Sequence, residues 1–194
     1  ADPRDPWWVP APLDGPAVPC RAALCVRPGG LAVVPEVEAA LREAARRLTE
    51  AGWAVEEIAD TPPIREASAL QLQLWLGDAY EAARAAADRE GDPAAIDLLE
   101  SFRGRAEAMP PDAIARALVR RATLAREWSL FLAEHPVLLV PVSAELPFPD
   151  GLDRTGTAGI ERAFEANLLQ VGLAPIGVPA LTVTTGLVGR IPVG

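Results

Sequence analysis

Residues 21–58 read RAALCVRPGGLAVVPEVEAALREAARRLTEAGWAVEEI, and this stretch decides the fold class. The short apolar run from Ala22 to Val26 predicts a buried strand, and Trp53 to Ile58 predicts a second one. Pro35 suits the first turn of the helix between them, where a missing N–H loses nothing, and Gly52 ends that helix. Strand, helix and strand in so short a stretch predict a βαβ unit with a parallel pair of strands.

Downstream of this unit, residues 62–134 predict a helical subregion. Its breaks are expected near Gly91-Asp92-Pro93 and Met109-Pro110-Pro111, where glycine and proline interrupt helices. The apolar face predicted for the last of these helices consists of Ile114, Leu118, Trp128 and Leu132.

The remaining chain predicts two more strands and a helix. Val137 to Val140 is a continuous apolar run, as in a strand covered on both faces. A helix is expected from about Gly159 to Leu169, with Gly172 to stop it. The chain is therefore predicted to be α/β, with part of a mixed central β-sheet flanked by helices.

The last residues predict a hairpin. Ala180 to Thr185 alternates as a strand, Gly186 to Gly189 is expected to turn, and a partner strand begins at Ile191. Because a strand usually runs about five residues or more, the short arm ending at Gly194 leads us to expect that it continues in a longer protein.

Residues 1–19 differ in composition from the rest of the chain. They hold six prolines together with the adjacent Trp7 and Trp8. This composition predicts an extended lead-in that the two tryptophans pin to a neighbouring surface.

Composition and charge exclude several classes of protein. The net charge is −9, and all 18 basic residues are arginine, so nothing favours a nucleic-acid partner. A chain without lysine has no lysine base or Schiff base. No apolar run approaches the roughly 18 residues that a membrane helix needs, and we expect a soluble, cytoplasmic protein without a membrane partner.

Cysteine and histidine are too few to build the common metal sites. Cys20 and Cys25 are the two cysteines and are expected to be reduced thiols, with Cys25 in the first strand. His135 is the single histidine and is expected to cap the end of a helix. We expect neither a metal nor a cofactor.

The candidate catalytic groups lack the partners that catalysis needs. Ser143 follows a predicted buried strand, where α/β folds place their sites, but it stands in no G-x-S-x-G elbow. Glu145, Asp150 and Asp153 share one loop and could do acid–base work or hold a divalent cation, but their spacing matches no EF-hand or zinc pattern, which favours a solvated acidic loop.

Several stretches carry a family pattern. Beyond residues 21–58 they are Asp2-Pro3-Arg4-Asp5, His135-Pro136-Val137-Leu138-Leu139-Val140-Pro141-Val142-Ser143, Gly177-Val178-Pro179-Ala180-Leu181-Thr182-Val183 and Gly189-Arg190-Ile191-Pro192-Val193-Gly194. In this order they resemble the C-terminal portion of the amidase signature enzymes, the serine amidohydrolases that cleave linear amides. The resemblance covers essentially the whole chain and implies that residues 1–194 are one segment of a single amidase-like domain.

The resemblance implies that catalysis depends on residues elsewhere. The family uses a nucleophilic serine, a bridging serine and a lysine from its N-terminal half, and this chain has no lysine. We therefore assign no catalytic residue. The implied partners are a small-molecule amide and the N-terminal half of the same enzyme, and a homodimer is left open. The positions implied to shape the substrate pocket are Trp75, Pro141, Val142, Ser143 and Ile176.

Two alternatives remain. A non-catalytic small-molecule-binding α/β module would share the acidic composition and the missing catalytic groups. An independent hydrolase that uses Ser143 is more remote, because no base is placed beside this serine by the sequence.

Overall fold

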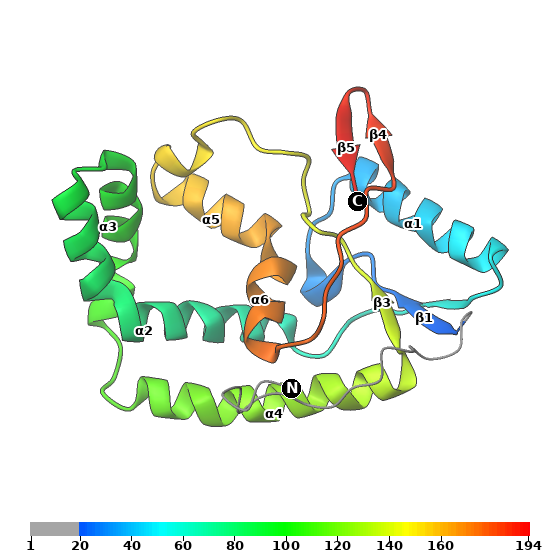
Figure 1. Ribbon diagram of the computed structural model, residues 1–194, viewed down its shortest axis with the longest axis horizontal. Helices are drawn as coiled ribbons and strands as arrows, with labels where there is room; N and C mark the ends of the chain where they lie inside the picture. The colour runs from blue at the N-terminus through cyan, green and yellow to red at the C-terminus, as the bar shows by residue number, and fades with distance from the viewer. Residues whose placement is uncertain (1–19) are drawn as a thin grey trace, which may run out of the picture.

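The computed structural model describes residues 20–194, the side chain of Asp78 excepted (Figure 1). The lead-in predicted for residues 1–19 lies outside this range. The described chain has an α/β fold with a small parallel sheet, several helices and a C-terminal hairpin. The fold class predicted from the sequence is thereby confirmed.

The sheet has three parallel strands. They are β1 (Arg21–Leu24), β2 (Ala54–Glu57) and β3 (Val137–Leu139), in the order β2-β1-β3. Ala22 pairs with Val55 on one side and with Val137 on the other. The predicted βαβ unit is confirmed. Strand β3 follows in the chain only after the helices of residues 64–134, and it pairs with β1.

Helix α1 (Pro35–Glu50) connects the first two strands. Pro35 stands in its first turn as predicted. The acidic residues in that turn are stabilised by the positive end of the helix dipole. Val37, Leu41 and Ala45 form its buried stripe. A short 3₁₀ turn, η1 (Pro28–Gly30), precedes this helix.

The predicted helical subregion contains α2 (Ile64–Glu90), α3 (Pro93–Glu107) and α4 (Ala113–Glu134). Both predicted breaks are confirmed. Gly91 ends α2 in the left-handed conformation, and the Asp92 side chain caps α3 by accepting a 2.9 Å hydrogen bond from the backbone N–H of Ala94.

The apolar face predicted for α4 is partly wrong. Trp128 is buried as expected, but Leu118 is 50% exposed, and the buried positions include Ala117 and Leu124 instead. The buried stripe begins at Ala113 and Ala117, each one residue before the predicted Ile114 and Leu118. The buried face of the helix is therefore rotated from the predicted one, and Leu118 lies on the solvent side of it.

The region after β3 contains η2 (Leu152–Arg154), α5 (Thr157–Ala166) and α6 (Leu168–Ile176). The prediction that Gly172 stops a helix is wrong. Gly172 lies inside α6, where an added Cβ would stand 2.7 Å from Cδ1 of Ile64, and Gly177 ends the helix with φ 78°. Glycine is needed at 172 for close helix packing rather than for a turn.

The predicted strand from Ala180 to Thr185 is also wrong. The hairpin instead pairs β4 (Gly186–Val188) with β5 (Ile191–Val193), and the turn falls at Gly189. Residues 180–184 are exposed and form no strand ladder within the described chain, so their alternating pattern has no sheet face to cover.

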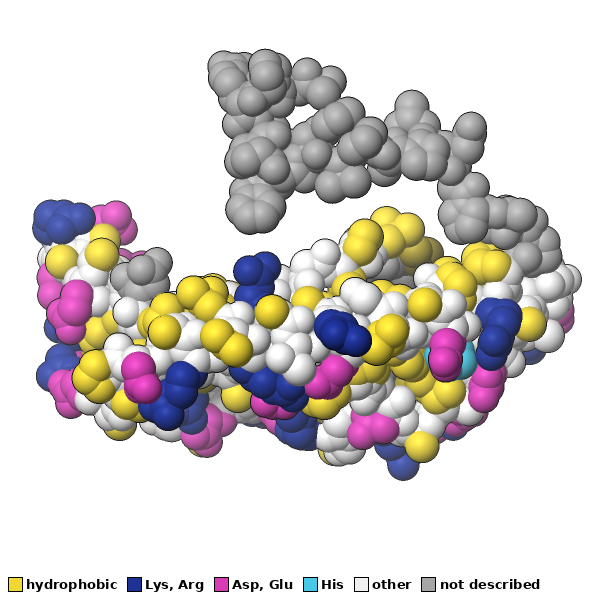
Figure 2. Space-filling model, turned by 90° about the horizontal axis from the view of Figure 1, so that it is seen from below, with side chains coloured by type: hydrophobic (Ala, Val, Ile, Leu, Met, Phe, Trp, Pro, Cys, Tyr) yellow, Lys and Arg dark blue, Asp and Glu magenta, His cyan; other side chains and the backbone are white. Residues whose placement is uncertain are grey.

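Most buried apolar residues form one cluster around Trp128, Leu124 and Ile64, and a smaller cluster surrounds Phe102. The face seen in Figure 2 shows hydrophobic side chains between groups of arginine and acidic side chains. Helix α4 exposes the apolar side chains of Leu118, Val119 and Leu130 to solvent. Within residues 20–194, no helix has the length and apolar character needed to cross a bilayer.

Candidate functional site

A pocket of about 290 Å³ opens where β3 ends. We call it the strand-end pocket. Its walls come from the loop after β3, the junction of α5 and α6, and the segment that leads into and includes the hairpin. Its lining includes Val142, Ser143, Glu145, Leu146, Phe148, Asn167, Thr182 and Thr184. This edge, beyond the carboxyl ends of parallel strands, is where open α/β sheets place their ligands.

Backbone hydrogen bonds fix the loop that forms one wall. The carbonyl of Ala144 accepts from the N–H of Val34 at 2.9 Å, and the N–H of Ala144 donates to the carbonyl of Ala166 at 2.8 Å. The loop is thus tied to the start of α1 and to the end of α5. Pro141, which is fully buried, ends the strand just before this wall.

Ser143 has no base beside it in the described chain. Its hydroxyl oxygen accepts a 3.3 Å hydrogen bond from the N–H of Glu145, which is a local turn contact. His135 is the C-terminal cap of α4, as predicted, and its ring lies 5.0 Å from that of Phe131. Within residues 20–194 it forms no hydrogen bond with Ser143, so the arrangement offers no serine–histidine pair.

The acidic loop is neutralised at its inner end. Glu145 pairs with Arg162, whose Nε lies 3.0 Å and whose Nη2 lies 2.5 Å from one carboxylate oxygen. This hydrogen bond raises the pKa of Arg162. Asp150 and Asp153 are exposed, and no group of acids, cysteines or histidine in the described chain is placed to hold a metal.

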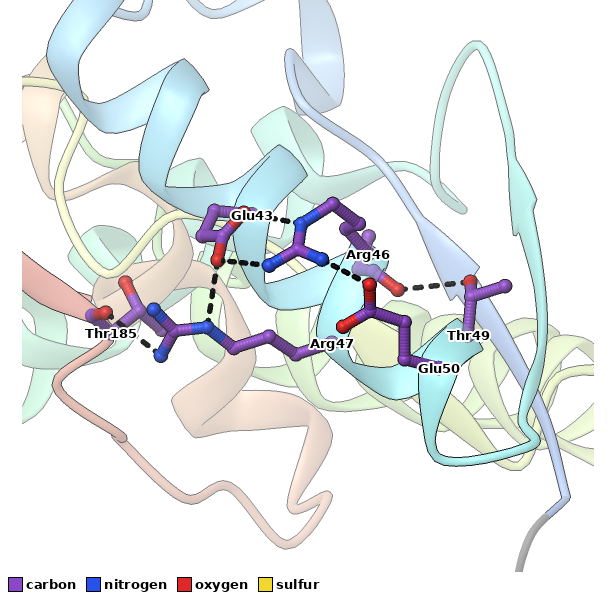
Figure 3. A network of polar contacts seen from close by, with 7 residues as sticks. Glu43, Arg46, Arg47, Thr49, Glu50 and Thr185 are labelled. Carbon is purple, nitrogen blue, oxygen red and sulfur yellow. Dashed lines mark hydrogen bonds and ion pairs between the residues drawn. The ribbon is translucent and has the colours of Figure 1, made fainter.

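Helix α1 also anchors the segment that closes the pocket. Arg47 points from α1 to the carbonyl of Thr185, to which it donates at 3.4 Å, while its Nε donates to Glu43 at 2.8 Å (Figure 3). Glu43 is shared with Arg46, and these contacts lower its pKa to about 2. Thr184, which lines the pocket, directly precedes the anchored residue.

A second cavity of about 300 Å³ lies among α2, α3 and α5. We call it the helical groove. Phe102 and Phe164 meet edge to face at its floor, with ring centroids 5.5 Å apart. Its charged residues pair with one another. The ion pairs are Arg65 with Glu165 at 2.7 Å and Arg105 with Glu161 at 3.3 Å.

Comparison with known proteins shows which enzymes the chain is related to. No protein-family model matches the chain. The indoleacetamide hydrolase of Bradyrhizobium japonicum is 31% identical over 198 aligned positions, which cover all of this chain and 42% of the relative. The chain is homologous to amidase signature enzymes. The indoleacetamide hydrolase of Bradyrhizobium diazoefficiens agrees, with 30% identity over all of this chain and 37% of its own length.

The predicted resemblance to the amidase signature family is therefore confirmed. The chain spans about two fifths of the length of the curated relatives that it matches. The alignment with these amidases runs through the whole chain, so it includes both the loop after β3 and the hairpin segment that form the strand-end pocket.

The structure separates the predicted substrate-binding residues of this amidase homologue. Val142 and Ser143 line the strand-end pocket, and Pro141 is buried directly before them. Trp75 lies on α2, 48% exposed, and Ile176 is buried in the main core at the end of α6. Neither of these two lines the pocket.

Sequence reasoning missed three polar residues of the pocket. Thr182 and Thr184 belong to the segment that was expected to be a strand, and Asn167 belongs to the predicted helix Gly159–Leu169. The alternation of residues 180–184 already placed both threonines on one polar side of this segment. Nothing in the sequence signals that the helix breaks at Asn167.

Proposed function

We propose that this chain forms the substrate-binding C-terminal part of an amidase that hydrolyses the C–N bond of a linear amide. The serine nucleophile, the bridging serine and the lysine would come from polypeptide homologous to the part of the relatives that the chain does not cover. One observation carries the proposal. The homologous chain holds, at the end of a parallel strand, a pocket whose hydrogen-bonding groups are uncharged or neutralised.

The lining of the strand-end pocket suits an uncharged amide with an apolar acyl group. Val142, Leu146 and Phe148 offer apolar surface, and Ser143 offers a hydroxyl group. The one acidic side chain that lines it, Glu145, is neutralised by Arg162. Because the relatives are named for indoleacetamide, we propose an arylacetamide as the substrate. Each methylene of fit would be worth roughly 1–3 kcal/mol in substrate choice.

A fluorophosphonate serine-hydrolase probe tests where the nucleophile lies. After incubation of the purified chain with the probe, intact-mass analysis should show no adduct, because Ser143 has no base within hydrogen-bonding distance in the described chain. Ser143→Ala serves as the matched control. A stoichiometric adduct that the control loses would overturn the proposal in favour of an independent hydrolase.

The alternative of a non-catalytic binding module rests on the same neutralised pocket. The two functions differ when the chain is expressed together with the N-terminal half of its parent enzyme. An amidase part should then gain arylacetamide hydrolysis, whereas a binding module should bind the amide without turnover.

A further inference from the structure

In the described chain, Phe148 is the single aromatic side chain that lines the strand-end pocket. It is half-buried and packs against the main hydrophobic cluster. Part of its ring is therefore held by the core, while another part borders the cavity. Leu146 does the same two residues earlier and extends the apolar wall. A ring held in this way offers a surface on which an aromatic ring of a ligand can pack.

The backbone around Phe148 is unusually restricted. Pro147 precedes it and Pro149 follows it, so the ring of each proline fixes its own φ, and Pro149 also holds Phe148 in the extended region. The carbonyl of Pro149 accepts a 3.3 Å hydrogen bond from the N–H of Leu152, and Ala144 is tied to α1 and α5 at the other end of the loop. Because Phe148 lies between these fixed points, its ring loses little conformational freedom when a ligand binds.

The surroundings of Phe148 favour an uncharged ligand of modest size. Glu145, the acidic side chain of the lining, is paired with Arg162. The wall across the cavity is formed by residues of the hairpin segment, among them Thr182 and Val193. The volume of about 290 Å³ is close to the lower end of the roughly 300–1,000 Å³ of small-molecule sites, which suits a ligand with one or two rings.

We propose that Phe148 is the specificity-determining residue of the strand-end pocket and that its ring packs against the aromatic ring of a bound arylacetamide. The amide end of the ligand then stays free for the serine that the proposed function assigns to polypeptide outside this chain. This inference rests on the proposed function, and it adds the residue that distinguishes an aryl group from an alkyl group of similar size.

Two ligands and one substitution test the preference for an aromatic ring. Phenylacetamide and cyclohexylacetamide carry the same amide on rings of similar size, but only phenylacetamide has an aromatic face. Phe148→Leu keeps an apolar side chain and removes the aromatic ring. The ratio of the Kd for cyclohexylacetamide to the Kd for phenylacetamide should therefore fall about two- to tenfold in this variant, as measured by isothermal titration.

Phe131→Leu is the matched control. Phe131 meets Trp128 edge to face, with ring centroids 6.1 Å apart, and it does not line the pocket. The ratio of the two Kd values in this variant should equal that of the unmodified chain.

A contact between the two rings can be measured in the unmodified chain, so this part of the test does not depend on the folding of a variant. The sequence has four phenylalanines, which keeps their ring signals few enough to assign. Nuclear Overhauser effects should connect the ring protons of bound phenylacetamide with those of Phe148. None should reach Phe164, which lies in the helical groove.

The outcomes separate this inference from the proposed function. If Val142 and Thr182 report saturable binding of phenylacetamide, but the ring-to-ring effects are absent or the ratio is unchanged in Phe148→Leu, the role of Phe148 is overturned and the proposed function stands. If no pocket residue responds to phenylacetamide, the proposed function fails, and the inference fails with it.

Discussion

The strand-end pocket and the helical groove have nearly the same volume, about 290 and 300 Å³, but different chemistry. In the groove, arginines and glutamates pair with one another, and two aromatic rings fill the floor. In the pocket, the charge of Glu145 is neutralised and uncharged donors face the space. The two cavities therefore differ not in volume but in the groups that they offer to a ligand, and this difference is the basis on which we propose the pocket as the binding site.

The largest expected effect is on the helical groove. Phe102→Ala removes a side chain that is 7% exposed and packs against Phe164, so the free energy of unfolding should fall by about 3 kcal/mol. Because the groove contributes packing, the Kd for phenylacetamide should not change. Urea denaturation measures the first quantity and ligand titration the second. A loss of binding in the folded variant would contradict the assignment of separate roles.

Gly172→Ala should affect the strand-end pocket through the scaffold. The added Cβ would stand 2.7 Å from Cδ1 and 2.9 Å from the carbonyl oxygen of Ile64, which forces α6 away from α2 and costs about 2 kcal/mol in unfolding free energy. Gly104→Ala is the matched control, because nothing lies within 4 Å of a Cβ there. That variant should gain about 0.5–1 kcal/mol from helix propensity. Thermal denaturation of the pair checks the contrast.

Arg162→Met should turn the neutral pocket into a charged one. The carboxylate of Glu145 would lose its partner, and an anionic ligand would then meet a like charge. The Kd for phenylacetate should rise about fivefold relative to that for phenylacetamide, which corresponds to roughly 1 kcal/mol, the repulsion of two unit charges about 4 Å apart in water. Isothermal titration with both ligands gives the ratio. An unchanged ratio would show that Glu145 does not act on the pocket.

The smallest expected effect concerns Glu43, which holds Arg47 where it contacts the carbonyl of Thr185 before the hairpin. The pKa of Glu43 is lowered from 4.5 to about 2, chiefly by its hydrogen bond to Arg46 and then by that to Arg47. Because the folded-state pKa lies below the unfolded one, this stabilisation is present above about pH 4.5 and is lost as the pH falls toward 2.

Glu43→Gln should therefore flatten part of the loss of stability between pH 4.5 and 2, as measured by urea unfolding at several pH values. Hydrogen exchange near Thr185, which Arg47 contacts, should rise slightly in Arg47→Ala. An identical pH profile for Glu43→Gln and the unmodified chain would contradict this role of Glu43.

The sequence predicted correctly those elements that depend on neighbouring residues, such as helix ends, or on strands that lie close together in the chain. The βαβ unit followed from apolar runs around a helix with Pro35 in its first turn, and the helical breaks followed from Gly91 and Pro93. The family resemblance followed from motifs in a fixed order, and homology confirms it.

The errors arose where a distant element decides the structure. Gly172 looks like a helix stop, but contact with Ile64, more than a hundred residues earlier, makes it a packing glycine. Ala180 to Thr185 alternates like a strand but finds no partner within the described chain. Asn167 lines the pocket because it lies between α5 and α6. Hydrophobic periodicity does not predict that the helix is interrupted at this residue.

The central claim is that the strand-end pocket, and not the helical groove, binds an amide. A chemical-shift map of the uniformly ¹⁵N-labelled chain titrated with indole-3-acetamide tests it most directly. The account predicts saturable shifts at Val142, Ser143 and Thr182, with Leu72 and Phe164 of the groove unaffected. Shifts confined to the groove, or no saturable shifts at either cavity, would contradict it.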